Sequence, residues 1–328
     1  MCFGQMTHLI SLLHTKPTIY LLMKKTKILS LLAAITLSLG SLTSCFGDGE
    51  STTKYTTPLG NLFNAVVDQS TGDVTLYSNV SYQVEWDLSN NIANITVMGL
   101  QLPNSSIYPK IEIKDLNMKY DYNGWYTVSA TDYIPADYAG NMIFNYLNFT
   151  VDTNFSPISI NYIVDNKFKV YSLLQMFGIV GNTRITNQNT NSSFAYNGDI
   201  CPSYYISYDV STKMGYLVIQ NFKLTENGST FNVKLPLLPF SVNSSGFVTM
   251  AADSVTPAQL SATLDSSSAL NSSGTALENA TASNISILYE PSVGVYIKFD
   301  YTVDNGELGK EAYRIEFERD FVTSSSTL

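Results

Sequence analysis

Tyrosines are the residues of this chain whose type and spacing best fit binding chemistry. Tyr122, Tyr126, Tyr133 and Tyr138 stand close together, with Tyr120 just before them. A tyrosine ring offers an apolar face for stacking, and its hydroxyl can form hydrogen bonds. We predict that Tyr122, Tyr126, Tyr133 and Tyr138 form a platform for a sugar ring or line a pocket for an apolar ligand. The alternative is that they are half-buried tyrosines on strands.

Carboxylates are the other candidates, because glycoside hydrolysis needs two of them facing each other. Asp87 and Asp209 are each followed by a serine two residues later, and Asp165 and Asp304 are each followed directly by an asparagine. This company is typical of turns, where Asp, Asn and Ser side chains bond the local backbone. The segment 68–73 lacks the ligand spacing of a calcium-binding loop and is also expected to be a turn. We predict no catalytic site and no enzymatic activity.

The first 44 residues have the layout of a secretory signal peptide. Three lysines between positions 24 and 27 precede an apolar run over 28–42 that ends in small residues. The run is shorter than the roughly 20 residues that a transmembrane helix needs. We expect segment 1–44 to be removed, with Met23 as the true start of the chain.

The end of this segment, Leu-Thr-Ser-Cys at positions 42–45, resembles the lipobox of bacterial lipoproteins. The resemblance implies that Cys45 becomes the first residue, is acylated and anchors the protein in a membrane. The acidic stretch 46–50 is similar to the surface-export signal of Bacteroidota lipoproteins. This implies a lipid-anchored protein of the outer membrane, exposed on the cell surface or facing the periplasm, with 45–54 as the acylated cysteine and tether.

Composition excludes several kinds of site from the mature chain. Both histidines, His8 and His14, lie in the segment expected to be removed. Neither a Ser-His-Asp or Cys-His site nor a His-ligated zinc site can then form. Cys201 is the remaining thiol, so no intramolecular disulfide is expected. We predict no cofactor and no metal.

Charge excludes nucleic acid as a partner. Segment 1–44 holds four of the 18 basic residues and none of the 27 acidic residues, so the mature net charge is −13. Phosphate binding needs a basic patch. We expect the chain to repel nucleic acid and anionic lipid head groups.

An internal duplication predicts the domain organisation. Residues 82–136 match 204–258 at a constant offset of 122, and the match resumes later at an offset of 139. This period is too long for a solenoid. It predicts two tandem homologous domains, 55–175 and 176–328, and the additional residues of the second copy form a surface loop at 264–284, rich in Ser, Ala and Asn.

Both copies read as antiparallel β-structure. Apolar and polar residues alternate in segments such as 82–88, which buries one face of a strand. The alternation slips at 113–116 and again at 235–238, which indicates a retained β-bulge or corner. An all-β fold of two antiparallel barrel or sandwich domains follows. Short helices are plausible only at 172–180 and after Pro257.

The duplication also separates core positions from other positions. A core position should stay apolar in both copies, whereas Tyr122, Tyr126 and Tyr133 are replaced by other residue types in the second copy. The pairs predicted to lie in the core are Trp86/Tyr208 and Trp125/Phe247. The platform is thus expected in the first copy alone.

Two stretches of the second copy resemble the lipocalin-like and calycin-like domains of Bacteroidota lipoproteins. They are Asn-Phe-Lys-Leu at 221–224 and Gly-Phe-Val-Thr at 246–249. The resemblance implies curved antiparallel sheets.

Two functions remain open. The first is a non-enzymatic envelope lipoprotein that binds a glycan or a lipophilic ligand. The second is a structural or protein-partner module of an outer-membrane complex or adhesin. A deep apolar cavity would favour a lipid, an exposed aromatic row a glycan, and long unpaired edge strands a protein partner.

Overall fold

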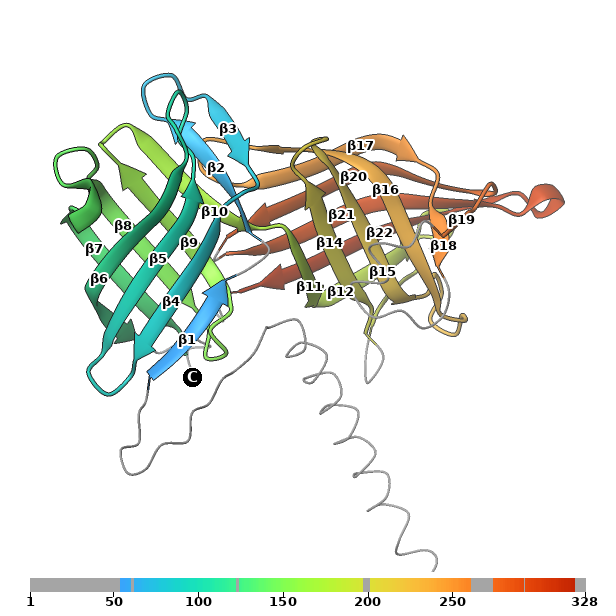
Figure 1. Cartoon of the computed structure of the whole chain (residues 1–328). Coiled ribbons are helices and arrows are strands. Elements are labelled where there is room, and N and C mark those ends of the chain that lie inside the picture. Colours follow the sequence, from blue (N-terminus) through green and yellow to red (C-terminus); the bar gives the residue numbers. More distant parts are fainter. Residues whose placement is uncertain are drawn as a thin grey trace, which may run out of the picture. The chain divides into compact units, whose positions relative to one another are not determined.

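The computed structural model describes residues 54–59, 62–121, 124–196, 201–260, 274–291 and 293–321. The predicted signal peptide, 1–44, and Cys45 lie outside the described residues. Within them the regular structure consists of β-strands and two short 3-10 turns (Figure 1). Among these residues no helix is long and apolar enough to cross a membrane.

Two antiparallel sheets contain all of these strands. The elements of the first are β1 (Lys54–Leu59), β2 (Leu62–Asp68), β3 (Val74–Tyr77), β4 (Ser81–Asp87), β5 (Ile92–Leu100), β6 (Tyr108–Tyr120), β7 (Tyr126–Tyr133), η1 (Ala136–Tyr138), β8 (Phe144–Val151), β9 (Pro157–Val164) and β10 (Phe168–Leu174). The elements of the second are β11 (Met176–Val180), β12 (Asn182–Asn187), β13 (Ser193–Ala195), β14 (Ser203–Asp209), β15 (Met214–Phe222), β16 (Phe231–Val242), β17 (Val248–Val255), β18 (Ala258–Leu260), β19 (Thr275–Ala276), β20 (Ala280–Glu290), β21 (Gly294–Asp304), η2 (Gly306–Leu308) and β22 (Lys310–Asp320).

The two sheets share one topology. The order β1-β4-β5-β6-β7-β8-β9-β10-β2-β3 in the first is matched by β11-β14-β15-β16-β17-β20-β21-β22-β12-β13 in the second. Only β18 and β19 of the second sheet lie off this path. The prediction of two tandem homologous antiparallel β domains is therefore confirmed.

Each sheet curls until its two ends meet at a broken strand. In the second sheet β11 pairs with β14 and β12 pairs with β22, yet only Gly181 separates β11 from β12. Two Cα steps span at most about 8 Å, so the far ends of the meander must approach each other. A Cβ on Gly181 would lie 2.6 Å from the carbonyl oxygen of Glu318, which explains the glycine. The first sheet closes in the same way through β1 and β2, so both domains are barrel-like.

The predicted bulges lie in the longest strands of the two domains, β6 and β16. Register shifts separate Ile113 from Leu116 and Leu235 from Leu238 in their pairing with the preceding strand. The central residue of each bulge has a positive φ, 57° at Asp115 and 55° at its counterpart Leu237. Each long strand thereby turns a corner and passes on to pair with β7 or β17.

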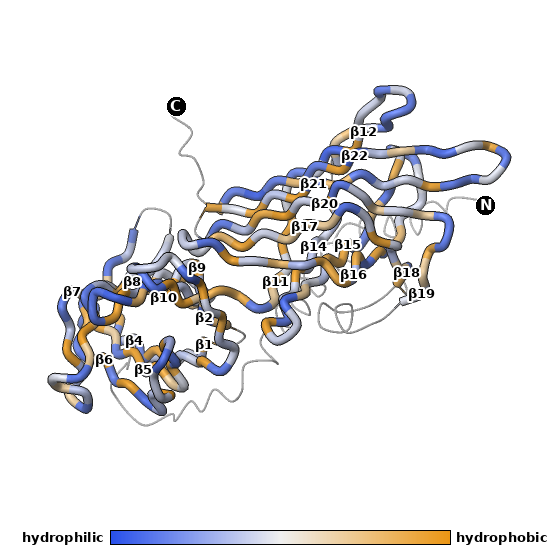
Figure 2. Tube along the Cα trace, turned by 90° about the horizontal axis from the view of Figure 1, so that it is seen from above, coloured by the Kyte–Doolittle hydropathy of each residue, from blue (hydrophilic) through white to orange (hydrophobic). Residues whose placement is uncertain are grey.

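The core follows the predicted alternation of side chains. Buried and outward positions alternate along β4, β5 and β14, and Figure 2 shows the same alternation of hydropathy along β20, β21 and β22. Trp86 and Tyr208 are both buried, as predicted. The prediction that Trp125 and Phe247 lie in the core is wrong, because both are only half-buried. Each directly follows the glycine turn that joins two neighbouring strands at their ends.

Three predictions about local structure are wrong. Residues 172–180 form the end of β10 and β11 rather than a helix, and the segment after Pro257 forms β18. Hydrogen bonding to distant strands outweighs local helical preference there. The loop predicted at 264–284 is too long, because β20 begins at Ala280. Its residues 264–273 lie outside the described residues.

Candidate functional site

Tyr126 belongs to a cluster of five aromatic rings in the first domain. Ring centroids lie 4.9 Å apart for Tyr126 and Tyr120, and 5.5 Å apart for Tyr126 and Phe155. Phe155 lies 5.1 Å from Trp86 and 6.0 Å from Tyr55. Tyr126 and Phe155 are stacked, with 15° between their planes. We call these five residues the aromatic cluster.

Strand pairing explains why four of these rings meet. Tyr55 of β1 is the register partner of Trp86 of β4, and Tyr120 of β6 is the partner of Tyr126 of β7. In the sheet order, only β5 separates the two pairs. Phe155 closes the gap between them from the turn after β8.

A tight turn holds Phe155 in place. The Asp152 carboxylate accepts hydrogen bonds from the backbone N–H groups of Asn154 and Ser156, at 2.8 and 2.9 Å. Phe155 has a φ of 59°, a left-handed conformation that is rare for an aromatic residue. Such strain persists only where the surroundings impose it, and it is often found at binding sites.

The cluster runs from the core to the surface. Trp86 is 1% exposed and forms its floor, while Tyr55 is 47% exposed and Tyr120 is 61% exposed. Tyr126 and Phe155 are half-buried between them. A ligand can therefore stack on the outer rings, which the inner rings support.

Polar atoms of the cluster have no hydrogen-bond partner among the described residues. This holds for the hydroxyls of Tyr55, Tyr120 and Tyr126, and for the buried Trp86 indole Nε1–H. A buried donor without a partner costs about 1 to 3 kcal/mol. The hydroxyls of Tyr55 and Tyr120 belong to exposed side chains, so a ligand can reach them.

The second domain keeps aromatic rings at two of the matched positions, because Phe177 matches Tyr55 and lies 6.4 Å from Tyr208, the counterpart of Trp86. The two tyrosines of the cluster on β6 and β7 are replaced. Val242 stands where the first copy has Tyr120, and Val248 stands where it has Tyr126. Tyr208, the counterpart of Trp86, is buried and its hydroxyl also lacks a partner. Burial raises the pKa of the Tyr208 hydroxyl well above its usual range, so it stays protonated.

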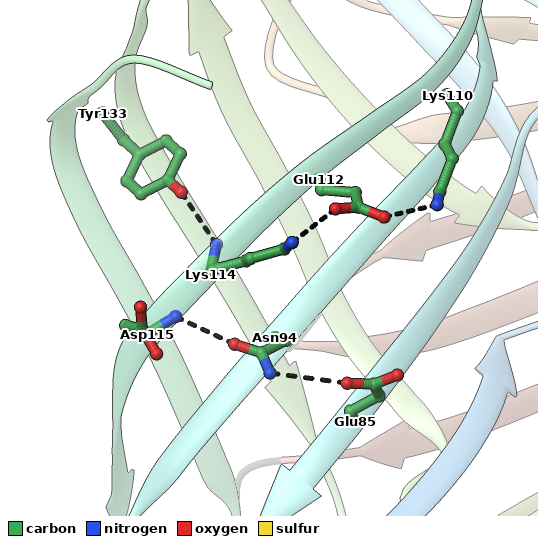
Figure 3. A network of polar contacts seen from close by, with 7 residues as sticks. All are labelled: Glu85, Asn94, Lys110, Glu112, Lys114, Asp115 and Tyr133. Carbon is green, nitrogen blue, oxygen red and sulfur yellow. Dashed lines mark hydrogen bonds and ion pairs between the residues drawn. The ribbon is translucent and has the colours of Figure 1, made fainter. Parts of the chain in front are cut away.

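Tyr133 and Tyr138 lie away from Tyr126 and have their hydroxyls engaged. The Tyr133 hydroxyl accepts the backbone N–H of Lys114 at 2.8 Å, beside the β6 bulge (Figure 3). The Tyr138 hydroxyl donates to the backbone carbonyl of Lys110 at 2.8 Å. In the second domain β18 pairs with the corresponding part of β16 instead. These two tyrosines secure β6, and Tyr122 lies outside the described residues.

An ion-pair network covers the same face of β6. Glu112 lies between Lys110 and Lys114 and pairs with both (Figure 3). The hydrogen bond from Lys110, reinforced by Lys114, lowers the pKa of the Glu112 carboxyl to about 2. Asn94 accepts the N–H of Asp115 at 2.9 Å, so side chains satisfy both N–H groups of the bulge. This network stabilises β6 and its bulge.

The repeated carboxylates lie in turns, as predicted. The Asp87 carboxylate accepts Ser89 Oγ at 2.6 Å, and Asp209 accepts Ser211 Oγ at 2.6 Å. Asp165 accepts the backbone N–H of Ile143 at 2.8 Å. These bonds engage at least one oxygen of each of these carboxylates. Among the described residues no three His, Cys, Asp or Glu side chains are grouped as a metal site would require.

A half-open hollow of about 710 Å³ lies on the second domain. Two of its tyrosines have engaged hydroxyls: Tyr196 accepts the N–H of Lys223 at 2.6 Å, and Tyr296 donates to Asp320 at 2.9 Å. Its Lys298 pairs with Glu316 at 3.0 Å. These bonds already engage both tyrosine hydroxyls and the lysine of the hollow.

Sequence reasoning found Tyr126 but missed most of its partners. Tyr55, Trp86 and Phe155 come from segments far apart in the chain, and Trp86 was predicted as core alone. The sequence around Phe155 indicates only a short turn that begins at Asp152. It does not indicate which aromatic rings Phe155 contacts. Comparison of the chain with protein-family models, curated proteins and solved structures finds no match.

Proposed function

We propose that this protein is a lipid-anchored binding protein of the outer-membrane surface, held by acylated Cys45, and that it binds a glycan through the aromatic cluster. The observation that carries the proposal is the exposed pair Tyr55 and Tyr120, whose hydroxyls have no partner among the described residues. Rings with an apolar face and a free hydroxyl suit a sugar, which offers C–H groups on one face and hydroxyls at its edge.

The filled interior supports a glycan rather than a lipophilic guest. The inner face of the first sheet carries large side chains that are fully buried, among them Tyr82, Phe144, Phe149 and Tyr162. A lipid-binding barrel instead needs an apolar cavity that takes up most of the ligand surface. The exposed aromatic rim is the better match for a surface-bound sugar.

Sheet edges give less support to a protein partner. The edge strands β1, β3, β11 and β13 are six, four, five and three residues long. Short edges offer few unpaired N–H and C=O groups for strand addition by a partner. The partner module therefore stays the second candidate.

Glycan titration of variants tests the proposal. Tyr120→Ala should weaken binding of neutral oligosaccharides by about 0.5 to 1.5 kcal/mol, the value of one stacking ring. The control is Tyr146→Ala, which removes a tyrosine that is 39% exposed and lies outside the cluster. Calorimetry against a set of oligosaccharides supplies the affinities. Equal affinity in both variants, or no binding by the unaltered protein, would contradict the proposal.

A further inference from the structure

The aromatic cluster stands where the membrane tether joins the first domain. Tyr55 is the second residue of β1, and Lys54 begins that strand. Lys54 is nine positions after Cys45. Nine residues span at most about 30 Å when fully extended. Whatever conformation the tether takes, an acylated Cys45 keeps Tyr55, the cluster residue at the start of β1, within roughly that distance of the leaflet.

From this proximity we infer that the ligand is the uncharged sugar head group of a glycolipid in the leaflet that carries the anchor. The inference rests on the proposed function and specifies the source of its glycan. A short tether raises the effective concentration of such a head group at the site to the millimolar range. At this concentration, the head group can occupy a shallow platform of a few rings even though the platform binds a free sugar only weakly.

Charge near the cluster favours a neutral head group. Two turns at this end carry carboxylates: Asp121 accepts the backbone N–H of Trp125 at 3.0 Å, and Asp152 accepts that of Asn154 at 2.8 Å. The mature chain has a net charge of −13. A surface of this net charge repels phosphate-bearing head groups, whereas an uncharged sugar is not repelled.

Reconstitution tests the inference with the acylated full-length protein. It is placed in phosphatidylcholine vesicles, with or without galactosyl diacylglycerol, and soluble galactose oligosaccharides are titrated against tryptophan fluorescence. A tether variant with a long Gly/Ser insertion after Glu50 and a soluble Cys45→Ala variant are measured alongside. Tyr120→Ala is the control with weakened binding.

We expect the glycolipid vesicles to raise the soluble sugar needed for half-saturation at least about tenfold, because the neighbouring head groups compete at high effective concentration. Tether insertion should reduce that factor, and Tyr120→Ala should shift the fluorescence titration to roughly two- to tenfold higher sugar concentrations. If the factor is unity while Cys45→Ala still binds the soluble sugar, the glycan is not taken from the same leaflet and the inference fails, although the proposed function stands. If no variant binds the sugar in any form, both fail.

Discussion

The Tyr133 hydroxyl accepts the backbone N–H of Lys114 at 2.8 Å, directly before the bulge residue Asp115. Because of the bulge, the N–H of Lys114 has no backbone carbonyl opposite it in the sheet. The Tyr133 hydroxyl of the next strand accepts this hydrogen bond instead. One tyrosine of the predicted platform is thus a structural element of β6.

Replacement of this hydroxyl should affect stability alone. Tyr133→Phe is expected to lower the free energy of unfolding by about 1 kcal/mol, the net value of one hydrogen bond, with unchanged glycan affinity. Urea denaturation and calorimetry measure the two quantities. The matched Tyr120→Phe should weaken binding and leave stability unchanged, because its hydroxyl has no partner among the described residues. If Tyr133→Phe weakened binding and Tyr120→Phe lowered stability, Tyr133 would be the binding residue and Tyr120 the structural one.

The membrane anchor gives a second prediction. Cys45→Ala should abolish incorporation of labelled fatty acid and yield an unprocessed or soluble product, because its thiol is the proposed acyl acceptor. Detergent partitioning with metabolic labelling measures this, and Cys201→Ala is the control cysteine. Continued labelling of the Cys45→Ala variant would reject the anchor.

A buried polar network in the first domain gives a third prediction. Tyr82 Oη lies 2.5 Å from Ser172 Oγ and 2.9 Å from Tyr162 Oη, and Asn64 accepts from Ser172 at 2.7 Å. Ser172→Ala should destabilise the protein by about 1 to 3 kcal/mol, because buried groups lose a partner. Thermal unfolding measures this. An unchanged melting temperature would mean that the remaining members satisfy one another.

An ion pair of the second domain gives a prediction about acid stability. Burial alone would raise the pKa of the Asp300 carboxyl, but hydrogen bonds from Arg314, Asn284 and Gln188 lower it overall. A lowered folded-state pKa stabilises the protein above the unfolded value of about 3.9, and this contribution is lost as the pH falls through the folded pKa. Asp300→Asn should therefore destabilise at pH 7 by about 1 to 3 kcal/mol, and the difference should shrink below about pH 4. A difference that is constant with pH would rule out the charge as its origin.

Backbone strain at the second bulge gives a fifth prediction. Leu237 has a φ of 55° and is 59% exposed, so its side chain gains little from packing. Leu237→Asn should stabilise the protein by roughly 1 kcal/mol, because asparagine tolerates the left-handed conformation. Chemical denaturation measures the change. A loss of stability would show that the leucine packs usefully at the edge of the bulge.

Local and repeated patterns of the sequence determined the β class, the duplication and the bulges. The alternation of period two is a property of any half-buried strand, and the slips near Asp115 and Leu237 break it at the same place in both copies. The sequence also determined that tyrosines distinguish the first copy. It predicted a platform that includes Tyr126, Tyr133 and Tyr138.

Tertiary structure decided which of those tyrosines share a site. The curled sheet brings Tyr55, Trp86 and Phe155 to Tyr126, whereas Tyr133 is directed to the backbone of β6. It also turned 172–180 into strands, because the ends of the meander must be hydrogen-bonded where the sheet closes. These outcomes depend on pairing between residues distant in the chain, and a local pattern carries no information on which distant strand supplies the partner.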